Sequence, residues 1–271
     1  MSPLAGAEPR FVIAPRDHRP ATFVLRRAER PGSFHLVEPF TYLDPSDGPY
    51  QVEASNDWTT DFASTPVFAL WLVPSDGIHA PAAILHDALG QGRTSPTLDD
   101  QVRADEIFRD AMANLGVPLL RRWMMWAAVA FRTIWTRARD MDRPRHWAHA
   151  LWVVLVFIVL AIAGCLATLD LFDASPFDLP WMGTGSTPEE LASGAAIAAL
   201  ATAFTSVVVR PWPMGVVAAL AIVPFAFPMV VAAIAYGGYF VAEALLAKIL
   251  RCLHRSTAAE SPPGLPKTLR D

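Results

Sequence analysis

The feature that most constrains this chain is a set of long apolar segments in its second half. His149–Leu169 is nearly uncharged and long enough to cross a hydrocarbon core, which takes about 20 residues. Leu191–Val209 is a weaker, alanine-rich segment, and Met214–Leu250 is a longer apolar tract. We therefore predict a transmembrane helical region over residues 147–252, with the lipid bilayer as its partner.

The third tract has two interpretations. It forms one tilted helix, which gives three crossings, or Pro224 and Pro228 break it into a re-entrant hairpin, which gives four. Basic residues after the tract favour an even number of crossings, and hence the hairpin. Glu243 within the tract is a functional candidate as an intramembrane carboxylate, or it pairs with Lys248 at the interface.

Charge around the first segment predicts its orientation. Four arginines crowd its start, and the loop after it carries acidic residues and no lysine or arginine; the arginines are Arg137, Arg139, Arg143 and Arg145. By the positive-inside rule, the N-terminal domain lies in the cytoplasm and residues 170–190 lie outside. We expect an integral protein of the inner (cytoplasmic) membrane.

Composition excludes several classes of protein. The 271 residues are 53% hydrophobic and 18% charged, too apolar for a disordered or purely soluble chain. A net charge of −4 excludes a globally basic nucleic-acid binder, so no nucleic-acid partner is expected. Two cysteines exclude a disulfide scaffold. Protein partners stay open.

Residues 21–146 predict an α+β domain. Short β-rich runs predict a small antiparallel sheet, with a turn at Asp44–Gly48; the runs are Thr22–Arg26, Phe34–Val37, Phe40–Leu43 and Tyr50–Ala54. Three helices are predicted after the strands, over Ala80–Leu89, Leu98–Leu115 and Leu119–Thr136, the first two forming an α-helical hairpin. The proline-rich residues 1–20 and the tail 253–271 are expected to be disordered.

The third predicted helix has a tryptophan-rich apolar face flanked by arginines. Such a helix either lies at the membrane interface or is a core helix with a basic edge. For the interface we single out Trp123, Trp126, Trp135, Arg121 and Arg122.

One carboxylate lies in an unfavourable position. Asp105 falls within the apolar stripe of the second predicted helix, and an unpaired buried charge is costly. His86 on the preceding helix could meet it across the hairpin. A histidine held by a carboxylate is either a general base or one half of a structural core pair.

Further polar residues could complete a site around this pair. Asp87 could bind a cation such as Ca²⁺, with Asp61 as a second ligand. Ser64 and Thr65 could contact substrate, although this loop segment equally suits a cap or turn. His79 could approach from the start of the first helix, or it is a surface residue.

Several motifs in one order resemble the DUF1353 family over about residues 20–135. They are Thr60–Pro66, Ala83–Leu89, Arg103–Phe108, Gly116–Val117 and Arg121–Met125. The resemblance implies a phage- or prophage-associated protein and carries no established function.

A more distant resemblance is to the His-Asp helix and partner Asp helix of phospholipase A2 enzymes. It implies His86 as the base, Asp87 as the calcium ligand and Asp105 as the orienting carboxylate. Gly90 stands where both families usually have tyrosine.

Three hypotheses follow. The leading one is a membrane-anchored, metal-assisted hydrolase of an ester, with a lipid as the possible substrate. The second is a non-catalytic, phage-derived membrane-anchored module that binds a partner or has a structural role. In the third, a holin-like protein, the membrane spans are primary.

Overall fold

The computed structural model describes residues 9–62, 65, 67–91, 98–141, 143–172, 174, 179 and 187–259. The chain divides into two compact units, Met1–Phe227 and Pro228–Asp271. Each is described by itself. The first holds the whole α+β domain and most of the apolar helices.

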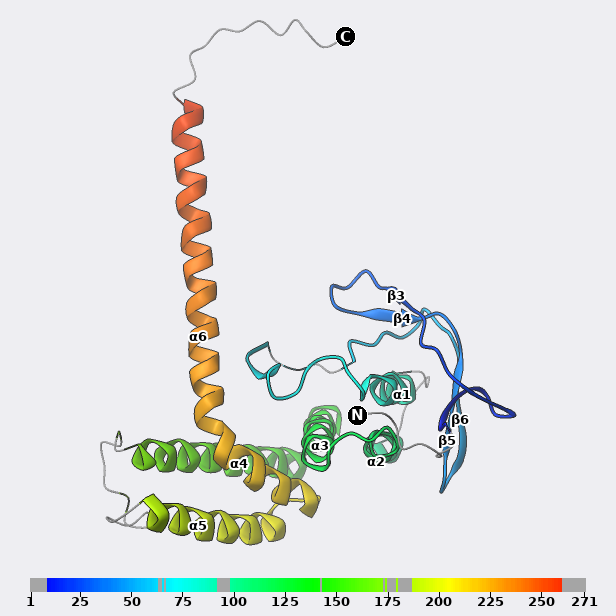
Figure 1. Cartoon of the computed structure of the whole chain (residues 1–271), viewed down its shortest axis with the longest axis horizontal. Coiled ribbons are helices and arrows are strands. Elements are labelled where there is room, and N and C mark those ends of the chain that lie inside the picture. Colours follow the sequence, from blue (N-terminus) through cyan, green and yellow to red (C-terminus); the bar gives the residue numbers. More distant parts are fainter. Residues whose placement is uncertain are drawn as a thin grey trace, which may run out of the picture. The chain divides into compact units, whose positions relative to one another are not determined.

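Within the described residues, six short strands form two antiparallel sheets, where the sequence predicts four strands in one small sheet. A four-stranded sheet has the order β2-β1-β5-β6, and β3 pairs with β4 (Figure 1). The strands are β1 (Phe11–Ala14), β2 (Asp17–Pro20), β3 (Leu25–Arg27), β4 (Phe34–Leu36), β5 (Phe40–Asp44) and β6 (Gly48–Val52). The prediction of disorder over residues 1–20 is wrong for residues 11–20, because β1 pairs with the buried strand β5.

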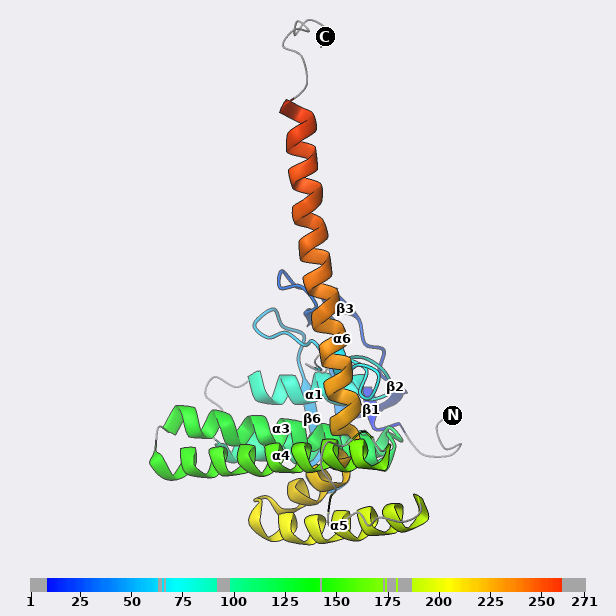
Figure 2. The ribbon, with the colours of Figure 1, turned by 90° about the vertical axis from the view of Figure 1, so that its left-hand side faces the viewer.

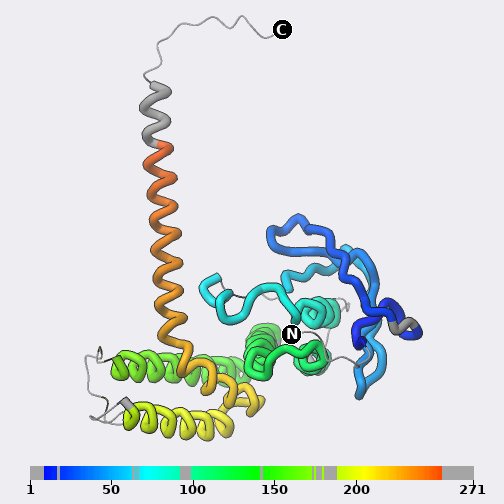
Figure 3. Tube along the Cα trace, in the orientation of Figure 1, coloured from blue at the N-terminus to red at the C-terminus, as the bar shows by residue number. Residues whose placement is uncertain are grey.

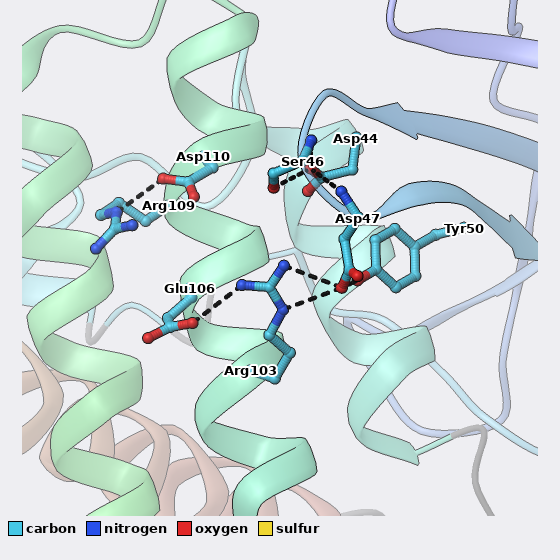
Figure 4. A network of polar contacts seen from close by, with 8 residues as sticks. All are labelled: Asp44, Ser46, Asp47, Tyr50, Arg103, Glu106, Arg109 and Asp110. Carbon is cyan, nitrogen blue, oxygen red and sulfur yellow. Dashed lines mark hydrogen bonds and ion pairs between the residues drawn. The ribbon is translucent and has the colours of Figure 1, made fainter.

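The predicted turn at Asp44–Gly48 joins β5 to β6. Asp44 Oδ1 accepts hydrogen bonds from the backbone N–H of Ser46 at 2.7 Å and of Asp47 at 3.2 Å. Gly48 has φ +86°, a value that glycine adopts without steric cost. Arg103 donates to Asp47 Oδ2 at 3.0 Å, so the turn is also tied to a helix (Figure 4).

Three helices pack beside the larger sheet: α1 (Ala80–Gln91), α2 (Leu98–Asn114) and α3 (Leu119–Met141). The Cα trace runs from the strands through α1 and α2 into α3, as Figure 3 shows. All three predicted helices are therefore present. Their shared core includes Tyr42, Ile84 and Met112.

The second helix ends where the sequence predicts. Gly116 has φ +74°, and the N–H of Val117 bonds to the carbonyl of Met112 at 3.0 Å. The N–H of Gly116 bonds to the carbonyl of Ala113 at 3.0 Å. These two bonds form a Schellman motif, which satisfies the last carbonyls of α2 and turns the chain toward α3.

Helix α3 belongs to two hydrophobic cores. Met125 and Val129 pack into the core of the α+β domain. Trp126 and Ala130 pack into a second core with Val153. Figures 1 and 2 show α3 between the smaller helices and α4 (Pro144–Leu171).

Among the described residues, three helices are long and apolar enough to cross a membrane: α4, α5 (Thr187–Val208) and part of α6 (Trp212–Ala259). Helix α6 continues through Pro224 and Pro228, so the hairpin interpretation is wrong. A proline removes one backbone donor but does not have to end an apolar helix, since the freed carbonyl can be satisfied locally. The helix also includes residues 253–259 of the predicted disordered tail, while residues 260–271 lie outside the described residues.

Two glycines permit close contact between these helices in the first unit. A Cβ placed on Gly164 of α4 would lie 2.2 Å from the carbonyl oxygen of Val223 in α6. A Cβ on Gly215 would lie 2.2 Å from the carbonyl oxygen of Thr205 in α5. Thr205 Oγ1 also donates to the carbonyl of Gly215 at 2.9 Å. Small residues and such bonds commonly join membrane helices.

Candidate functional site

A pocket of about 120 Å³ lies where α1, α2 and α3 meet. Most of its lining residues carry polar side chains, and three of them are predicted site residues: His86, Asp87 and Asp105. The lining residues are His86, Asp87, Gly90 and Gln91 of α1, Gln101, Ala104 and Asp105 of α2, and Val129, Arg132, Thr133 and Thr136 of α3.

The predicted contact between His86 and Asp105 is present. His86 Nε2 lies 2.9 Å from Asp105 Oδ1, and the Asp105 side chain is 6% exposed. The other carboxylate oxygen, Oδ2, accepts a hydrogen bond from the hydroxyl of Thr133 at 2.8 Å. Both oxygens of this buried carboxylate are therefore partnered, which offsets the cost of its burial.

The second ring nitrogen of His86 faces a different carboxyl group. His86 Nδ1 lies 4.0 Å from Asp87 Oδ1, beyond a hydrogen bond but within the range of charge interaction. The imidazole also packs against Phe108, with ring centroids 5.1 Å apart. With the Nε2–H donated to Asp105, Nδ1 is the nitrogen that can take up a proton.

Asp87 is a buried carboxyl group with an unsatisfied atom. Its side chain is 14% exposed, and Oδ2 has no hydrogen-bond partner among the described residues. Burial raises the pKa of Asp87 to about 6. A hydrogen bond from Thr60 opposes this shift of the pKa, and the negative charge of Asp61 adds to it.

The loop of Asp61 is anchored through Thr60. The Thr60 backbone pairs with Phe34 of β4, and its hydroxyl accepts the N–H of Phe62 at 3.1 Å. Phe62 has φ +63°, a conformation that costs energy for a residue other than glycine. Asp61 is exposed and Thr65 is half-buried, and neither lines the pocket. Ser64 lies outside the described residues.

Residues 34–129 match the DUF1353 family model, described as a protein of unknown function. This match covers part of the range over which the sequence motifs resemble that family. No curated protein and no solved structure matches the chain. The DUF1353 segment includes β4, β5, β6, α1, α2 and about half of α3, and it ends at Val129, the first α3 residue in the pocket lining.

His79 lies in the DUF1353 segment but not in the pocket lining. Its side chain is buried just before α1, at 1% exposure, and it does not line the pocket. Burial lowers its pKa, and the nearby charge of Arg121 lowers that pKa further. The prediction that His79 is a surface residue is wrong, because its side chain is buried, with Gly77 of the preceding loop beside its ring.

The predicted interface residues of α3 have different surroundings. Trp126 is 5% exposed and packs among α4 and α6, so it is inside the protein rather than at a lipid-facing position. The guanidinium carbon of Arg109 lies over the ring of Trp123, 5.1 Å from the centroid of that ring. Trp135 is 39% exposed and meets the Trp147 ring edge-on. A membrane role for the exposed residues, with Arg121 and Arg122, stays a prediction.

The expected calcium site can be compared with the oxygen atoms that the structure offers as ligands. Ca²⁺ takes about six to eight oxygen ligands. Asp87 offers one buried, unpartnered carboxylate oxygen, and Asp61 lies close enough to affect its pKa. Within the described parts of the chain, no group of three or more His, Cys, Asp or Glu side chains could hold a metal. A calcium-binding role for Asp87 and Asp61 stays a prediction.

Sequence reasoning missed Thr133, Arg132 and Thr60. Thr133 lies 28 positions beyond Asp105, so no local spacing connects the two. The interaction of Thr60 with Asp87 likewise joins a loop to a helix far along the chain. Only the unmet need of buried Asp105 for a second partner could have indicated a residue such as Thr133.

Proposed function

We propose that the α+β domain is a membrane-anchored hydrolase that cleaves an ester with His86 as general base. The supporting observation is the contact of His86 Nε2 with buried Asp105 at 2.9 Å, in the lining of a pocket. A carboxylate that fixes the tautomer of an imidazole and stabilises its protonated form is a recurrent arrangement in hydrolases.

The proposed reaction uses one water molecule. His86 Nδ1 removes a proton as the water oxygen bonds to the ester carbonyl carbon. The tetrahedral intermediate then collapses, the carbon–oxygen bond to the leaving alcohol breaks, and the proton on Nδ1 passes to that alcohol. The products are one acid and one alcohol, and His86 returns to its neutral form.

Each neighbouring carboxyl group has a separate role in this proposal. Asp105 orients the ring and Thr133 orients Asp105, so neither has to touch the substrate. Asp87, once ionised, stabilises the proton on Nδ1 from a distance of 4.0 Å. No step requires a metal ion.

The experiment uses the full chain in detergent micelles or nanodiscs. Hydrolysis of 4-nitrophenyl butyrate and fatty-acid release from phosphatidylcholine vesicles are measured for the wild type and for His86→Ala. Removing a general base should reduce the rate by about 100-fold or more, and added imidazole should restore part of it. His35→Gln, at a half-buried histidine that contacts the Trp58 carbonyl, is the matched control.

The same assay separates the competing hypothesis. If His86→Ala melts at a lower temperature but hydrolyses both substrates as fast as the wild type, the network of His86, Asp105 and Thr133 is a structural tie. The non-catalytic module would then be the better description. Repeating the assay with EDTA, and with added CaCl₂ on Asp87→Asn, tests the calcium expectation separately.

The membrane context makes a lipid ester the preferred substrate within this proposal. The pocket is built partly by α3, and the opposite side of α3 packs against α4, which is apolar enough to cross a membrane. We also propose that the domain faces the cytoplasm at the inner membrane, as the distribution of arginines predicts.

A further inference from the structure

One arginine that lines the pocket forms no ion pair with another described residue. Arg132 of α3 lines the pocket and is exposed. In the part of the chain that the structure describes, it has no carboxylate within the 4.0 Å of an ion pair. Arg103 and Arg109, on the neighbouring helix, both form such pairs, with Asp47 and Asp110 (Figure 4).

Arg132 is close enough to the site to act on it. Its positive charge lowers the pKa of Asp87, so the guanidinium lies within electrostatic range of that carboxyl group without bonding to it. Among the described residues no carboxylate pairs with this guanidinium, so its donors can bind a ligand in the pocket. Asp105, the other carboxylate there, is already occupied by His86 and Thr133.

The rest of the lining offers neutral polar groups beside this cation. Gln101 of α2 and Thr136 of α3 face the same pocket. Thr136 lies four residues after Arg132, on the same side of the helix. A guanidinium presents paired donors that match the two oxygens of a carboxylate or phosphate. A pocket of about 120 Å³ has room for such a group but not for a whole lipid.

We propose that Arg132 binds an anionic oxygen group, a carboxylate or phosphate, on the substrate and so selects esters that carry a negative charge. The kinetic test of this inference rests on the proposed hydrolase function. The binding of the anion itself does not depend on that function. Arg132 is a specificity-determining residue in this proposal, while His86 performs the chemistry.

The kinetic experiment compares two esters with the same leaving group. The neutral ester is 4-nitrophenyl butyrate, and the anionic ester is mono-4-nitrophenyl glutarate. We expect the wild type to prefer the anionic ester by about tenfold in kcat/KM, which corresponds to about 1.4 kcal/mol of transition-state stabilisation. Arg132→Gln should reduce this ratio to near one, and Arg132→Lys should keep part of it.

The matched control is Arg137→Gln. Arg137 is exposed, lies on the same helix and is not part of the pocket lining. Its substitution changes the net charge by the same amount and should preserve the preference. If Arg137→Gln abolishes the preference as fully as Arg132→Gln, the effect comes from general surface charge and the inference is overturned.

A binding experiment separates failure of this inference from failure of the proposed function. The thermal stabilisation of the full chain by inorganic phosphate and by glutarate is measured, since a ligand bound to the folded state raises the melting temperature. The wild type should be stabilised and Arg132→Gln should not. If neither ester is hydrolysed but this difference is present, the hydrolase proposal fails and the anion site stands.

Equal stabilisation of the two proteins by both anions would overturn the anion site. A third experiment identifies the source of the anion. It compares fatty-acid release from phosphatidylcholine vesicles with and without phosphatidylglycerol. A preference for phosphatidylglycerol that Arg132→Gln removes identifies a lipid headgroup. A preference confined to the glutarate ester identifies a small soluble anion.

Discussion

The carboxylate of Asp105 joins His86 to Thr133. One of its oxygens is 2.9 Å from His86 Nε2, and the other accepts the Thr133 hydroxyl at 2.8 Å. These residues come from α1, α2 and α3, so a single buried side chain connects the three helices that build the pocket. A shift in the position of α3 relative to α2 would therefore change the position of the His86 imidazole.

Replacing Thr133 with valine should test this connection. The variant keeps the shape of the side chain but removes the bond to Asp105, which should cost about 1.5–3 kcal/mol of stability for a bond to a charged group. In the hydrolase proposal kcat also falls, by about tenfold for about 1.4 kcal/mol of barrier, with KM little changed. Thr133→Ser should restore both properties. Loss of stability with unchanged kcat would assign Thr133 a structural role alone.

The pKa of Asp87 predicts how stability depends on pH. Because burial raises this pKa from 3.8 to about 6, the folded protein holds the proton more tightly than the unfolded chain does. The stabilising contribution is complete below about pH 4 and is lost as pH rises through about 6. The loss is on the order of 3 kcal/mol.

Asp87→Asn should remove that dependence. The variant should melt above the wild type at pH 7.5, and the difference should vanish near pH 4. Thermal melts at several pH values measure this, with Asp110→Asn as a surface control on α2. In the hydrolase proposal the more stable variant is slower, since it lacks the charge beside Nδ1. Parallel melting curves for the two proteins at every pH would contradict the assignment.

The contact at Gly164 predicts a sharp difference between two glycines. Gly164→Ala inserts a methyl group toward the Val223 carbonyl and should cost about 1–3 kcal/mol, as overpacking does. Gly237→Ala should be neutral or slightly stabilising, because nothing lies within 4 Å of its Cβ position and alanine favours helix. Melting temperatures in one detergent compare them. Similar melting temperatures would argue against close packing of α4 and α6.

The continuity of α6 predicts membrane topology. If all three long apolar helices cross the membrane, the N-terminal domain and the end of α6 are expected on opposite sides of it. Green fluorescent protein, which fluoresces only in the cytoplasm, and alkaline phosphatase, which is active only outside it, can be fused in turn to each terminus. We expect a cytoplasmic N-terminus and an external C-terminus. Two cytoplasmic termini would require an even number of crossings after all.

Sequence periodicity predicted the helices well, because each has a clear apolar stripe and a glycine or proline near an end. It failed at β1 and β2, where four prolines in the first twenty residues indicated disorder. Phe11 and Val12 are buried nonetheless, since pairing with β5 covers them. Short strands depend on such distant partners more than helices do.

The candidate site was predictable only in part. Asp105 was identifiable because a carboxylate in an apolar stripe needs a partner, and His86 was the nearest suitable residue. Arg132 has no such signal, since an exposed arginine on an amphipathic helix is ordinary. Its neighbourhood depends on how α3 packs against α1, and no pattern within one helix encodes that.

The division of α3 between two cores has a practical consequence for anyone who wants the domain without the membrane. A fragment that ends at Met141 would keep Met125 and Val129 covered but would strip the protein cover from Trp126 and Ala130. That bare stripe would favour aggregation in water, and trimming α3 would remove Arg132 and Thr133 with it. The border between the two hydrophobic cores runs lengthwise along one helix, so no cut in the chain can follow it.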